Sequence, residues 1–479
     1  MTILDTQTTT FTATSGGKSL ATAATFDVIN PATGRVFAQA PAVTPDQLDE
    51  VFAAAQSAFE DWRTDEKARR AALSAAADVL EARAAELGAV LTAEQGKALA
   101  DAQIEIHTAV AWLRYFATLE IPREIIRDDA DAFEEIIRRP MGVVSAIAPW
   151  NFPIVLAMWK IAPALLAGNT IVIKPSPYTP LTTLALGEVL RGVLPDGVLN
   201  VVTGPDPLGA TMVSHPVPRK VSFTGSTAVG RKVALGAAEG LKRVTLELGG
   251  NDPAVVLGDV DVAEVAPQIF WSAFANNGQI CLAVKRIYAH ESIRADLVDA
   301  LADIASSVKV GDGAAEGVQL GPVNNLPQLN RVRELVDDAV ANGARVAAGG
   351  AAGEGEGYFY PPTVLDGLSD SARVVEEEQF GPVLPVVSFT DENDAIALAN
   401  RSEYGLTASV WSKDVEHATA LAAQVDAGQV GVNGHGRGVL PHLPFGGHKS
   451  SGIGVENGPW GYNSFCDMQV IAGPPRTTA

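Results

Sequence analysis

Residues 142–174 have the sequence GVVSAIAPWNFPIVLAMWKIAPALLAGNTIVIK. They contain two short apolar runs, Val143–Ile147 and Thr170–Ile173, which have the length and the β-branched residues of buried strands. The residues between them are numerous enough for the crossover that joins two parallel strands. Three similar runs follow, with helical stretches such as 180–194 and 228–240 between them: Leu199–Val202, Val221–Phe223 and Val244–Leu246. This alternation predicts a doubly wound α/β fold around a parallel sheet.

On the amino-terminal side of this stretch, residues 44–120 have a helical pattern. Thr44-Pro-Asp-Gln47 offers an N-cap, a proline at the first helical position and a capping-box glutamine. An apolar face then recurs at spacings of three and four: Leu48, Val51, Phe52, Ala55, Phe59 and Trp62. Thr92-Ala-Glu-Gln95 repeats the capping signal before a further helix through Trp112 and Phe116. Residues 121–140 predict a polar hairpin that turns at Asp128–Asp131, and such a hairpin is an edge that pairs with another element or subunit.

On the carboxyl-terminal side, a second α/β series extends from Asn251 to about Phe445. Its expected strands are separated by helical stretches such as 293–308 and 329–342: Asp252–Leu257, Arg286–Ala289, Val383–Phe389 and Leu406–Val410. Residues 465–471 again have the pattern of an edge strand.

Composition and charge exclude several classes of partner and indicate a cellular compartment. The chain has 479 residues, a net charge of −21 and a pI near 4.7, so nucleic acid and anionic membranes are not expected partners. No apolar run is long enough to span a membrane. The amino terminus lacks the features of a secretory signal, and we expect residues 1–25 to be a mobile tail. Because Cys281 and Cys466 are the only cysteines, no disulfide framework is available, and a reducing cytoplasm is the expected compartment.

Three polar residues follow predicted structural elements. Cys281 lies after a predicted helix end at Asn277-Gly278 and is either a buried, inert thiol or a nucleophile. Glu247 ends the last strand of the first series and is either a surface glutamate or a functional carboxylate at the edge where α/β sheets bind ligands. Asn151, in a proline-bounded loop, is either a turn residue or a donor to an oxyanion.

A fourth feature joins a predicted strand to a predicted helix, in Phe223-Thr-Gly-Ser-Thr-Ala-Val-Gly230. Gly225 allows a ligand to approach the backbone closely, and the helix terminus at Ser226 offers exposed N–H groups to a phosphate. The motif differs from the GxGxxG of standard Rossmann domains and is moderately specific by itself.

Together with further motifs, these residues resemble the aldehyde dehydrogenase superfamily, in its NAD(P)-dependent oxidising branch, over essentially the whole chain. The motifs occur in family order: Asn30–Gly34, PWNFP at Pro149–Pro153, IKPSPYTP at Ile173–Pro180, FTGSTAVG at Phe223–Gly230, LELGG at Leu246–Gly250, NNGQIC at Asn276–Cys281, EEEQFGPVLP at Glu376–Pro385 and PFGGHKSSGIG at Pro444–Gly454. The resemblance implies two Rossmann-like α/β domains and a small β oligomerisation element.

The resemblance also implies roles for individual residues. Cys281 would attack the aldehyde as a thiolate, and Asn151 with the backbone N–H of Cys281 would hold the oxyanion. After hydride transfer, Glu247 would activate the water that hydrolyses the thioester. Lys174, which we group with both the catalytic and the cofactor residues, matches the lysine that binds the adenosine ribose.

Further family positions concern the two ligands. The other expected NAD contacts are Trp150, Ser176, Gly225, Ser226, Gly230, Glu378 and Phe380. Phe152, Leu156 and Trp159 match substrate-tunnel positions, which favours aldehydes with apolar tails. We expect no metal ion in the site.

The chain departs from the family pattern at three positions. Pro177 replaces a glutamate that chelates the adenosine ribose and disfavours NADP, so NAD is expected but NADP remains possible. Asn251 replaces the usual lysine after Leu248-Gly-Gly. A glycine-rich loop, 433–440, replaces an aromatic lid, and its His435 and Arg437 either contact a polar substrate tail or are solvated.

The family organisation predicts the domain boundaries. The dinucleotide-binding domain would comprise residues 26–120 and 141–249, and the catalytic domain residues 250–448. Residues 121–140 and 462–475 would form the oligomerisation element of a homodimer or homotetramer, with Cys466 as a structural residue.

Other functions remain open at this stage. The acylating branch passes its acyl group to coenzyme A, but it lacks a glutamate matching Glu247. A semialdehyde dehydrogenase, a thioesterase or esterase, and a catalytically idle structural relative are further alternatives. The combination of Cys281, Glu247 and Asn151 favours the hydrolytic aldehyde dehydrogenase, with an unidentified aldehyde as its substrate.

Overall fold

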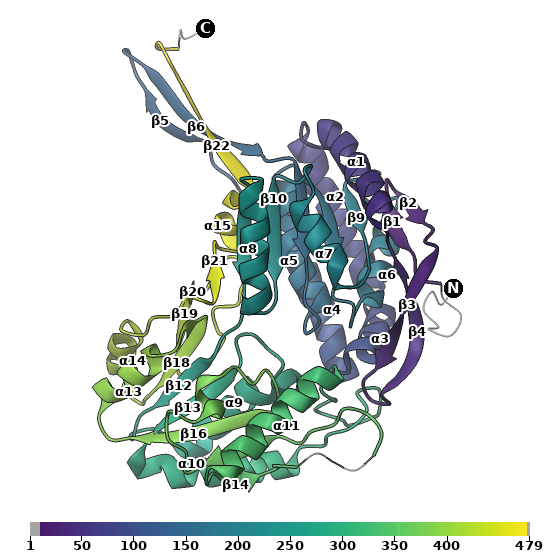
Figure 1. The fold of residues 1–479 in the computed structure, drawn as a ribbon. Coiled ribbons are helices and arrows are strands. Elements are labelled where there is room, and N and C mark those ends of the chain that lie inside the picture. The colour runs from purple at the N-terminus through teal and green to yellow at the C-terminus, as the bar shows by residue number, and fades with distance from the viewer. Residues whose placement is uncertain (1–9, 352, 354, 477–479) are drawn as a thin grey trace.

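The computed structural model describes residues 10–351, 353 and 355–476. Figure 1 shows two α/β units with a β arm projecting from the first of them. We call them the first unit, built on an eight-stranded sheet, and the second unit, built on a seven-stranded sheet. The predicted α/β class with parallel sheets is therefore confirmed. Among the described residues, no helix has the length and apolarity required to cross a membrane.

The first sheet has a parallel centre and antiparallel edges. All five strands predicted from the first series are present in it, in the order β9 (Leu199–Val201), β8 (Thr170–Lys174), β7 (Val143–Ile147), β10 (Lys220–Thr224) and β11 (Arg243–Glu247). Neighbouring strands of this set are parallel. The crossovers are the helices α5 (Pro153–Leu166), α6 (Leu181–Leu190), α7 (Asp206–Ser214) and α8 (Thr227–Glu239).

The ends of this sheet were not predicted. β1 (Ala13–Ser15) and β2 (Lys18–Leu20) form an antiparallel hairpin, and Thr14 pairs with Val201 of β9. The prediction of a mobile tail is therefore wrong for residues 13–20, where the side chain of Ala13 is buried; residues 1–9 lie outside the described residues. At the opposite edge, β21 (Gly452–Ile453) pairs with β11, so a late segment of the chain returns to the first unit.

The helices before this sheet show how local sequence determines their ends. α1 (Pro45–Trp62) begins with the predicted capping box of Thr44 and Gln47, and the six apolar residues predicted for its face are its buried residues. α2 (Glu66–Ala82), α3 (Ala84–Gln95) and α4 (Leu99–Thr118) follow. The second capping prediction is wrong. Thr92 lies in the last turn of α3 and does not begin the next helix. Its carbonyl oxygen accepts the N–H of Gly96, whose left-handed backbone ends α3.

The second sheet is also mainly parallel. Its strand order is β14 (Arg345–Ala348), β15 (Thr363–Asp366), β16 (Val383–Phe389), β13 (Val284–His290), β12 (Asp252–Val256), β18 (Thr407–Trp411) and β19 (Gln429–Val432). β14 alone among these strands is antiparallel to its neighbour. The packed helices include α9 (Val262–Phe274), α10 (Glu291–Ser307), α11 (Leu326–Ala341), α13 (Glu392–Asn400) and α14 (Val415–Ala422).

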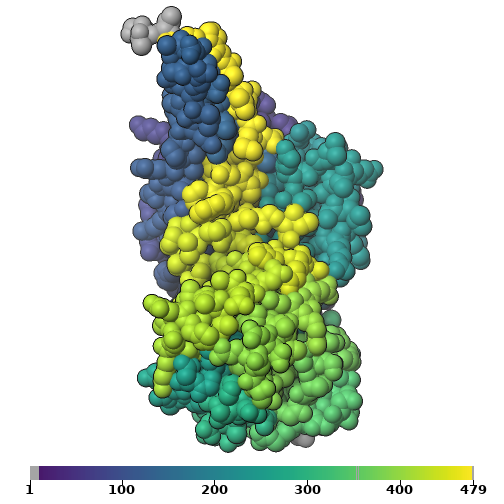
Figure 2. Space-filling model, turned by 90° about the vertical axis from the view of Figure 1, so that its left-hand side faces the viewer, coloured from purple at the N-terminus to yellow at the C-terminus, as the bar shows by residue number. Residues whose placement is uncertain are grey.

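The arm consists of the predicted hairpin and the terminal strand. β5 (Glu124–Asp128) and β6 (Phe133–Pro140) turn between Asp129 and Ala132, and β22 (Cys466–Gly473) pairs with β6 along its length. Figure 2 shows that this arm protrudes from the body of the molecule. Its apolar side chains at Met468 and Val470 are 76% and 68% exposed, so the arm has an uncovered apolar surface.

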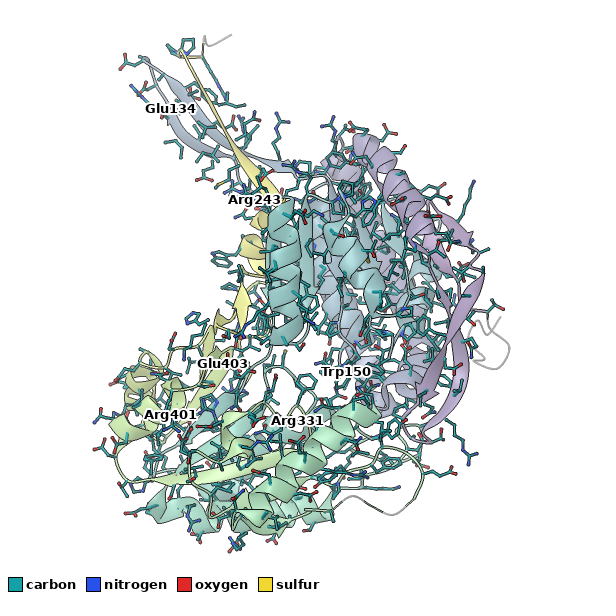
Figure 3. All side chains as sticks on the ribbon, viewed as in Figure 1. Glu134, Trp150, Arg243, Arg331, Arg401 and Glu403 are labelled. Atoms are coloured by element: carbon teal, nitrogen blue, oxygen red, sulfur yellow. The ribbon has the colours of Figure 1, made fainter. Side chains whose placement is uncertain are left out.

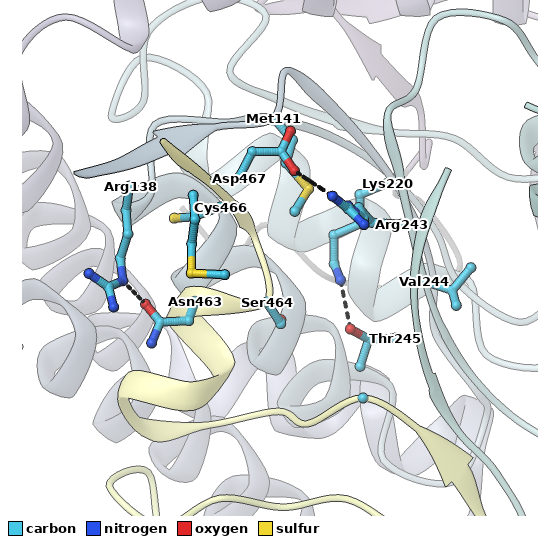
Figure 4. A pocket seen from close by; sticks show the side chains of 12 residues that line it. Arg138, Met141, Lys220, Arg243, Val244, Thr245, Asn463, Ser464, Cys466 and Asp467 are labelled. Atoms are coloured by element: carbon cyan, nitrogen blue, oxygen red, sulfur yellow. Dashed lines mark hydrogen bonds and ion pairs between the residues drawn. The ribbon is translucent and has the colours of Figure 1, made fainter. Parts of the chain in front are cut away.

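A polar contact links the arm to the first sheet (Figure 4): Arg243 of β11 donates to Asp467 of β22 at 3.3 Å. Beside it, within the sheet, the buried Lys220 of β10 donates to Thr245 of β11 at 2.6 Å. These residues border a cavity of about 330 Å³ that does not include Cys281.

The two units meet at a sheet edge that carries several of the predicted site residues. β11 ends at Glu247 and β12 begins at Asp252, so the carboxyl edge of the first sheet faces the start of the second. Figure 3 shows Trp150 of the first unit and Arg331 of the second on facing sides of this boundary, and both line one cavity.

Candidate active site

Cys281 is positioned by a short left-handed segment. α9 ends at Phe274, earlier than predicted, and a 3₁₀ turn at Ala275–Gly278 follows. Asn276, Asn277 and Gly278 have φ values of 50°, 58° and 72°. A Cβ atom at Gly278 would lie 2.2 Å from the carbonyl oxygen of Gly381, so this position requires glycine for both its backbone angle and its space.

Cys281 lies where two cavities adjoin. The junction cavity, of about 240 Å³, is lined by Trp150, Asn151, Gly225, Glu378 and other residues, and by Cys281 itself. The apolar cavity, of about 300 Å³, also includes Cys281. The half-buried thiol therefore borders both spaces at once.

The loop that carries Asn151 is fixed by a buried ion pair. Lys97 Nζ donates to Glu105 Oε2 at 2.6 Å and to the carbonyl oxygen of Asn151 at 2.9 Å. Glu105 accepts the N–H groups of Ile154 and Val155 at the start of α5. Both partners of this pair are 1% exposed, so the contacts hold the loop firmly in place.

Asn151 is brought to the nucleophile loop. Its Nδ2 donates to the carbonyl oxygen of Gln279 at 3.0 Å, and its own carbonyl oxygen accepts Asn276 Nδ2 at 3.1 Å. Asn151 is 2% exposed and lines the junction cavity beside Cys281. Asn151 and Cys281 therefore border the same space.

Glu247 is a buried carboxyl group without a hydrogen bond among the described residues. It is 3% exposed, and neither of its carboxyl oxygens has a partner there. Burial raises its pKa well above the ordinary value, and the negative charge of Glu456 acts in the same direction while Lys160 opposes it. Lys160 Nζ donates to Glu456 Oε1 at 2.7 Å. A buried carboxyl group with a raised pKa is suited to accept a proton near neutral pH.

The charges around Cys281 oppose one another. Burial raises the pKa of the Cys281 thiol to about 12. Lys285 acts against this increase, whereas Asp252, Glu247 and Glu378 add to it. Glu247 lines neither of the two cavities that contain Cys281, although its charge acts on the thiol.

A large cavity of about 840 Å³ continues from the junction cavity over the first sheet. Both cavities include Trp150, Gly225 and Ser226, and the large cavity also includes Lys174 and Ser176. Burial lowers the pKa of Lys174 to about 8, although the carboxylate of Asp206 opposes that effect. The cavity lies at the N-terminus of α8, where backbone N–H groups favour a phosphate. Its shape and donors therefore fit a dinucleotide.

Ser226 is the N-cap of α8, and its hydroxyl accepts the N–H of Val229 at 3.4 Å. Gly230 does not line these cavities. It packs against Leu248, whose Cδ2 would lie 2.3 Å from a Cβ at that position, so its expected cofactor contact is replaced by helix packing.

The opposite wall of the junction cavity comes from the second unit. Glu378 accepts the N–H of Gly250 at 3.1 Å, and Lys285 Nζ lies 3.8 Å from its Oε1. Phe380 has a φ of 49° and packs edge-on against Trp150, with ring centroids 5.3 Å apart. Glu378, Phe380 and Trp150 are therefore close enough together to bind one end of a shared ligand.

The apolar cavity contains all three expected substrate residues, Phe152, Leu156 and Trp159. Sequence reasoning missed Trp112 of α4, which stacks on Trp159 with ring centroids 5.7 Å apart. Asp101 also lines this cavity. The local sequence of α4 does not indicate that these two residues line a cavity, because their position depends on how α4 packs against α5.

One site assignment needs correction. Lys174 and Cys281 line different cavities, so the catalytic assignment of Lys174 is not supported and its cofactor assignment is retained.

For His435 and Arg437 the sequence left two alternatives, a contact to a substrate tail or solvation. His435 fits neither, because it lines neither cavity that contains Cys281 and contacts the carbonyl oxygen of Leu282 at 2.7 Å and Ser409 at 3.0 Å. Arg437 is exposed, which agrees with the solvated alternative.

Lys285 is the main residue that sequence reasoning missed. It lies four positions after Cys281 and donates to the carbonyl oxygens of Ile280 and Cys281. The sequence feature that could have pointed to it is a lysine within a largely apolar stretch, Leu282-Ala-Val-Lys-Arg-Ile-Tyr-Ala289. A lysine is seldom buried in such a stretch unless it is paired.

Comparisons with known proteins agree with this geometry. The model of the aldehyde dehydrogenase family matches residues 19–471. A phenylacetaldehyde dehydrogenase of Pseudomonas fluorescens is 40% identical over 91% of this chain and 89% of its own. The peroxisomal aminoaldehyde dehydrogenase 1 of Pisum sativum is 38% identical over 92% of this chain and 91% of its own. The structure of an NAD⁺ complex of aldehyde dehydrogenase from Bacillus cereus superimposes with a TM-score of 0.95, at 34% identity and 98% coverage of both chains. The chain belongs to the aldehyde dehydrogenase family.

Proposed function

We propose that this enzyme oxidises an aldehyde to a carboxylic acid at Cys281, with NAD bound in the large and junction cavities. The observation that carries the proposal is the position of the Cys281 thiol, which borders both the junction cavity and the apolar cavity. Such a thiol can reach an aldehyde on one side while a dinucleotide lies on the other. When it is bound, NAD supplies the acceptor for the hydride.

The first half of the reaction forms a covalent bond. The Cys281 thiolate attacks the aldehyde carbon, and the carbonyl oxygen becomes an oxyanion that Asn151 Nδ2 and the N–H of Cys281 stabilise. Loss of the hydride from that carbon restores the carbonyl group and leaves a thioester on Cys281. Because burial raises the pKa of the thiol, the protein must provide a base or a positive charge to form the thiolate.

The second half releases the acid. Glu247 accepts a proton from water as the water oxygen attacks the thioester, and the bond to the Cys281 sulfur breaks. The absence of hydrogen bonds to the Glu247 carboxyl among the described residues leaves both oxygens available for this task. A glutamate at this position also favours water over coenzyme A as the acyl acceptor.

The apolar cavity favours an aldehyde with an apolar or aromatic tail. Trp112, Trp159 and Phe152 supply aromatic surfaces in a space of about 300 Å³. An arylacetaldehyde is the substrate class that we favour, in agreement with the phenylacetaldehyde dehydrogenase among the relatives.

A cationic aldehyde is a second candidate, because Asp101 and two indole rings could bind a positively charged tail. The aminoaldehyde dehydrogenase among the relatives is consistent with this alternative. The ratio of kcat/KM for phenylacetaldehyde and for an aminoaldehyde, measured with the native protein and with Asp101→Asn, distinguishes the two classes. If the substrate is cationic, Asp101→Asn should lower kcat/KM for the aminoaldehyde more than kcat/KM for phenylacetaldehyde.

We also propose that the arm mediates a homodimer or homotetramer, since its apolar side chains are exposed in the single chain. Cys281 and Cys466 are both free thiols, which supports a reducing compartment such as the cytoplasm.

The proposed reaction is tested by following NADH absorbance with a panel of aldehydes and no coenzyme A. We expect turnover that Cys281→Ser abolishes and that Cys466→Ser preserves, because Cys466 lies at the arm and outside the two cavities that contain Cys281. Turnover that requires coenzyme A would overturn the hydrolytic assignment. Full activity in Cys281→Ser would remove the proposed nucleophile.

A further inference from the structure

Lys285 is a buried cation directly behind the nucleophile. It belongs to β13, and its side chain is 3% exposed. Lys285 Nζ donates to the carbonyl oxygen of Ile280 at 2.9 Å and to that of Cys281 at 2.5 Å. An ammonium group in this position must be paired to offset its loss of water, and Glu378 at 3.8 Å supplies the opposite charge.

These contacts join three parts of the site. The two carbonyl groups belong to the loop that carries the thiol, and Glu378 belongs to the wall of the junction cavity, where NAD is proposed to bind. Glu378 is itself held by the N–H of Gly250. Lys285 therefore restrains the thiol relative to the cofactor side of the junction cavity.

The charge of Lys285 also acts on the thiol. Of the groups that act on Cys281, Lys285 favours the thiolate, whereas Asp252, Glu247 and Glu378 favour the protonated thiol. Glu378 and Asp252 both lie near Lys285, since each is influenced by its charge. A positive charge here counteracts both burial and the surrounding carboxylates.

The neighbouring imidazole does not supply that charge. His435 contacts the carbonyl oxygen of Leu282 at 2.7 Å and Thr407 at 3.1 Å, and Thr407 donates to Asp252 at 2.6 Å. Burial lowers the pKa of His435 to about 4, so its ring is neutral at pH 7. Its N–H is suited to the Leu282 carbonyl, and Lys285 provides the cation on this side of the loop.

We propose that Lys285 is a positioning residue for the nucleophile, which fixes the backbone at Cys281 and whose positive charge favours the thiolate over the thiol. The inference rests on the proposed role of Cys281. It adds a determinant of thiol reactivity outside the set of Cys281, Asn151 and Glu247.

The test measures thiol reactivity directly. The cofactor-free protein is alkylated with iodoacetamide at pH 8, and the modified Cys281 peptide is quantified by mass spectrometry so that Cys466 does not interfere. Lys285→Met removes the hydrogen bonds and the charge, Lys285→Gln keeps an N–H donor without charge, and Lys285→Arg keeps the charge. Lys220→Met is the matched control, because Lys220 is a buried lysine of the first sheet that lines neither cavity at Cys281.

A nearby opposite charge shifts a pKa by about 1–3 units. The greater nucleophilicity of a more basic thiolate offsets about half of that effect. We therefore expect the alkylation rate of Cys281 to fall about 3-fold to 30-fold in Lys285→Gln and Lys285→Met. Lys285→Arg should retain most of the native rate, and Lys220→Met should equal it.

Native alkylation rates in folded Lys285→Gln would overturn the inference, and so would a loss in Lys285→Arg as large as in Lys285→Gln. Circular dichroism establishes which variants are folded, and the Gln and Arg variants decide the question if Lys285→Met does not fold. Turnover that survives Cys281→Ser would instead overturn the proposed function. Native alkylation in the lysine variants, together with turnover that depends on Cys281, would reject only the role of Lys285.

Discussion

Glu247 and Cys281 illustrate how single residues acquire function from surroundings that are distant in sequence. Both are ordinary residue types whose reactivity depends on burial and on neighbouring charge. Their motifs located them in the sequence, but their raised pKa values come first from burial and then from charges on other elements. Glu456 adds to the increase at Glu247, whereas Lys285 opposes the increase at Cys281. Local patterns do not reveal which charges meet in space, which is why the Lys160–Glu456 pair was not predicted.

The first prediction concerns the pH dependence of the proposed base. Glu247 accepts a proton only as a carboxylate, and its pKa is raised, so acid release should be lost as the pH falls through a value well above that of an ordinary glutamate. A kcat profile between pH 5 and 9 should show this acidic limb, while Glu247→Gln should lower kcat by about 10²-fold to 10⁴-fold and remove the limb. An unchanged limb in the variant would assign the titration to another group.

A second prediction at this scale concerns cofactor choice. Pro177 supplies no carboxylate, but Asp206 lines the same cavity as Lys174 and Lys232. A carboxylate there repels an additional phosphate on the adenosine ribose. We expect Asp206→Asn to raise kcat/KM for NADP by about tenfold and to change that for NAD little. Asp303→Asn, on α10 of the second unit, is the control. If the ratio of kcat/KM for NADP to kcat/KM for NAD is the same in the two variants, Asp206 is not the determinant of cofactor choice.

At the scale of elements, the ends of strands and helices create the site. Asn151 follows β7, Gly225 follows β10 and Glu247 ends β11, so three neighbouring parallel strands bring these residues to one sheet edge. This arrangement could be predicted from alternating strands and helices. The antiparallel edges and the displaced start of α4 could not, because they depend on pairing and packing between distant segments.

The left-handed segment before Cys281 gives the third prediction. Gly278→Ala places a Cβ at φ +72° and 2.2 Å from the Gly381 oxygen, and it should destabilise the fold by about 2–4 kcal/mol and lower kcat/KM. Gly192→Ala is matched, since Gly192 has a φ of +78° and no atom within 4 Å of its Cβ position. Urea unfolding measures the free energy of unfolding of both variants. If both lose the same amount, the space at Gly278 does not matter.

At the scale of the whole molecule, the fold class and most of the central strands were predictable, since they depend on short local patterns. The cavities were not, because each combines residues from several elements. Trp112 and Asp101 both entered the site through packing between elements. The early strand β1 shows the same limit, because its pairing with β9 joins residues far apart in the sequence.

The fourth prediction concerns assembly. The exposed Val470 on the arm should lie in a subunit interface, and Val470→Lys should shift the protein toward monomers in sedimentation velocity. Val340→Lys, at a 46% exposed position on α11 far from the arm, should leave assembly unchanged. A native protein that sediments as a monomer would reject the proposed role of the arm.

The proposed reaction requires that Cys281 holds the acyl group as a thioester after hydride transfer. This intermediate is trapped by mixing the Glu247→Gln variant with NAD and phenylacetaldehyde, stopping the reaction with acid and analysing the peptides by mass spectrometry. We expect one phenylacetyl group on Cys281, formed only when NAD is present and accumulating because the base is missing. An acyl group on another residue, or turnover with no acyl group on Cys281 at any time, would refute the proposed reaction.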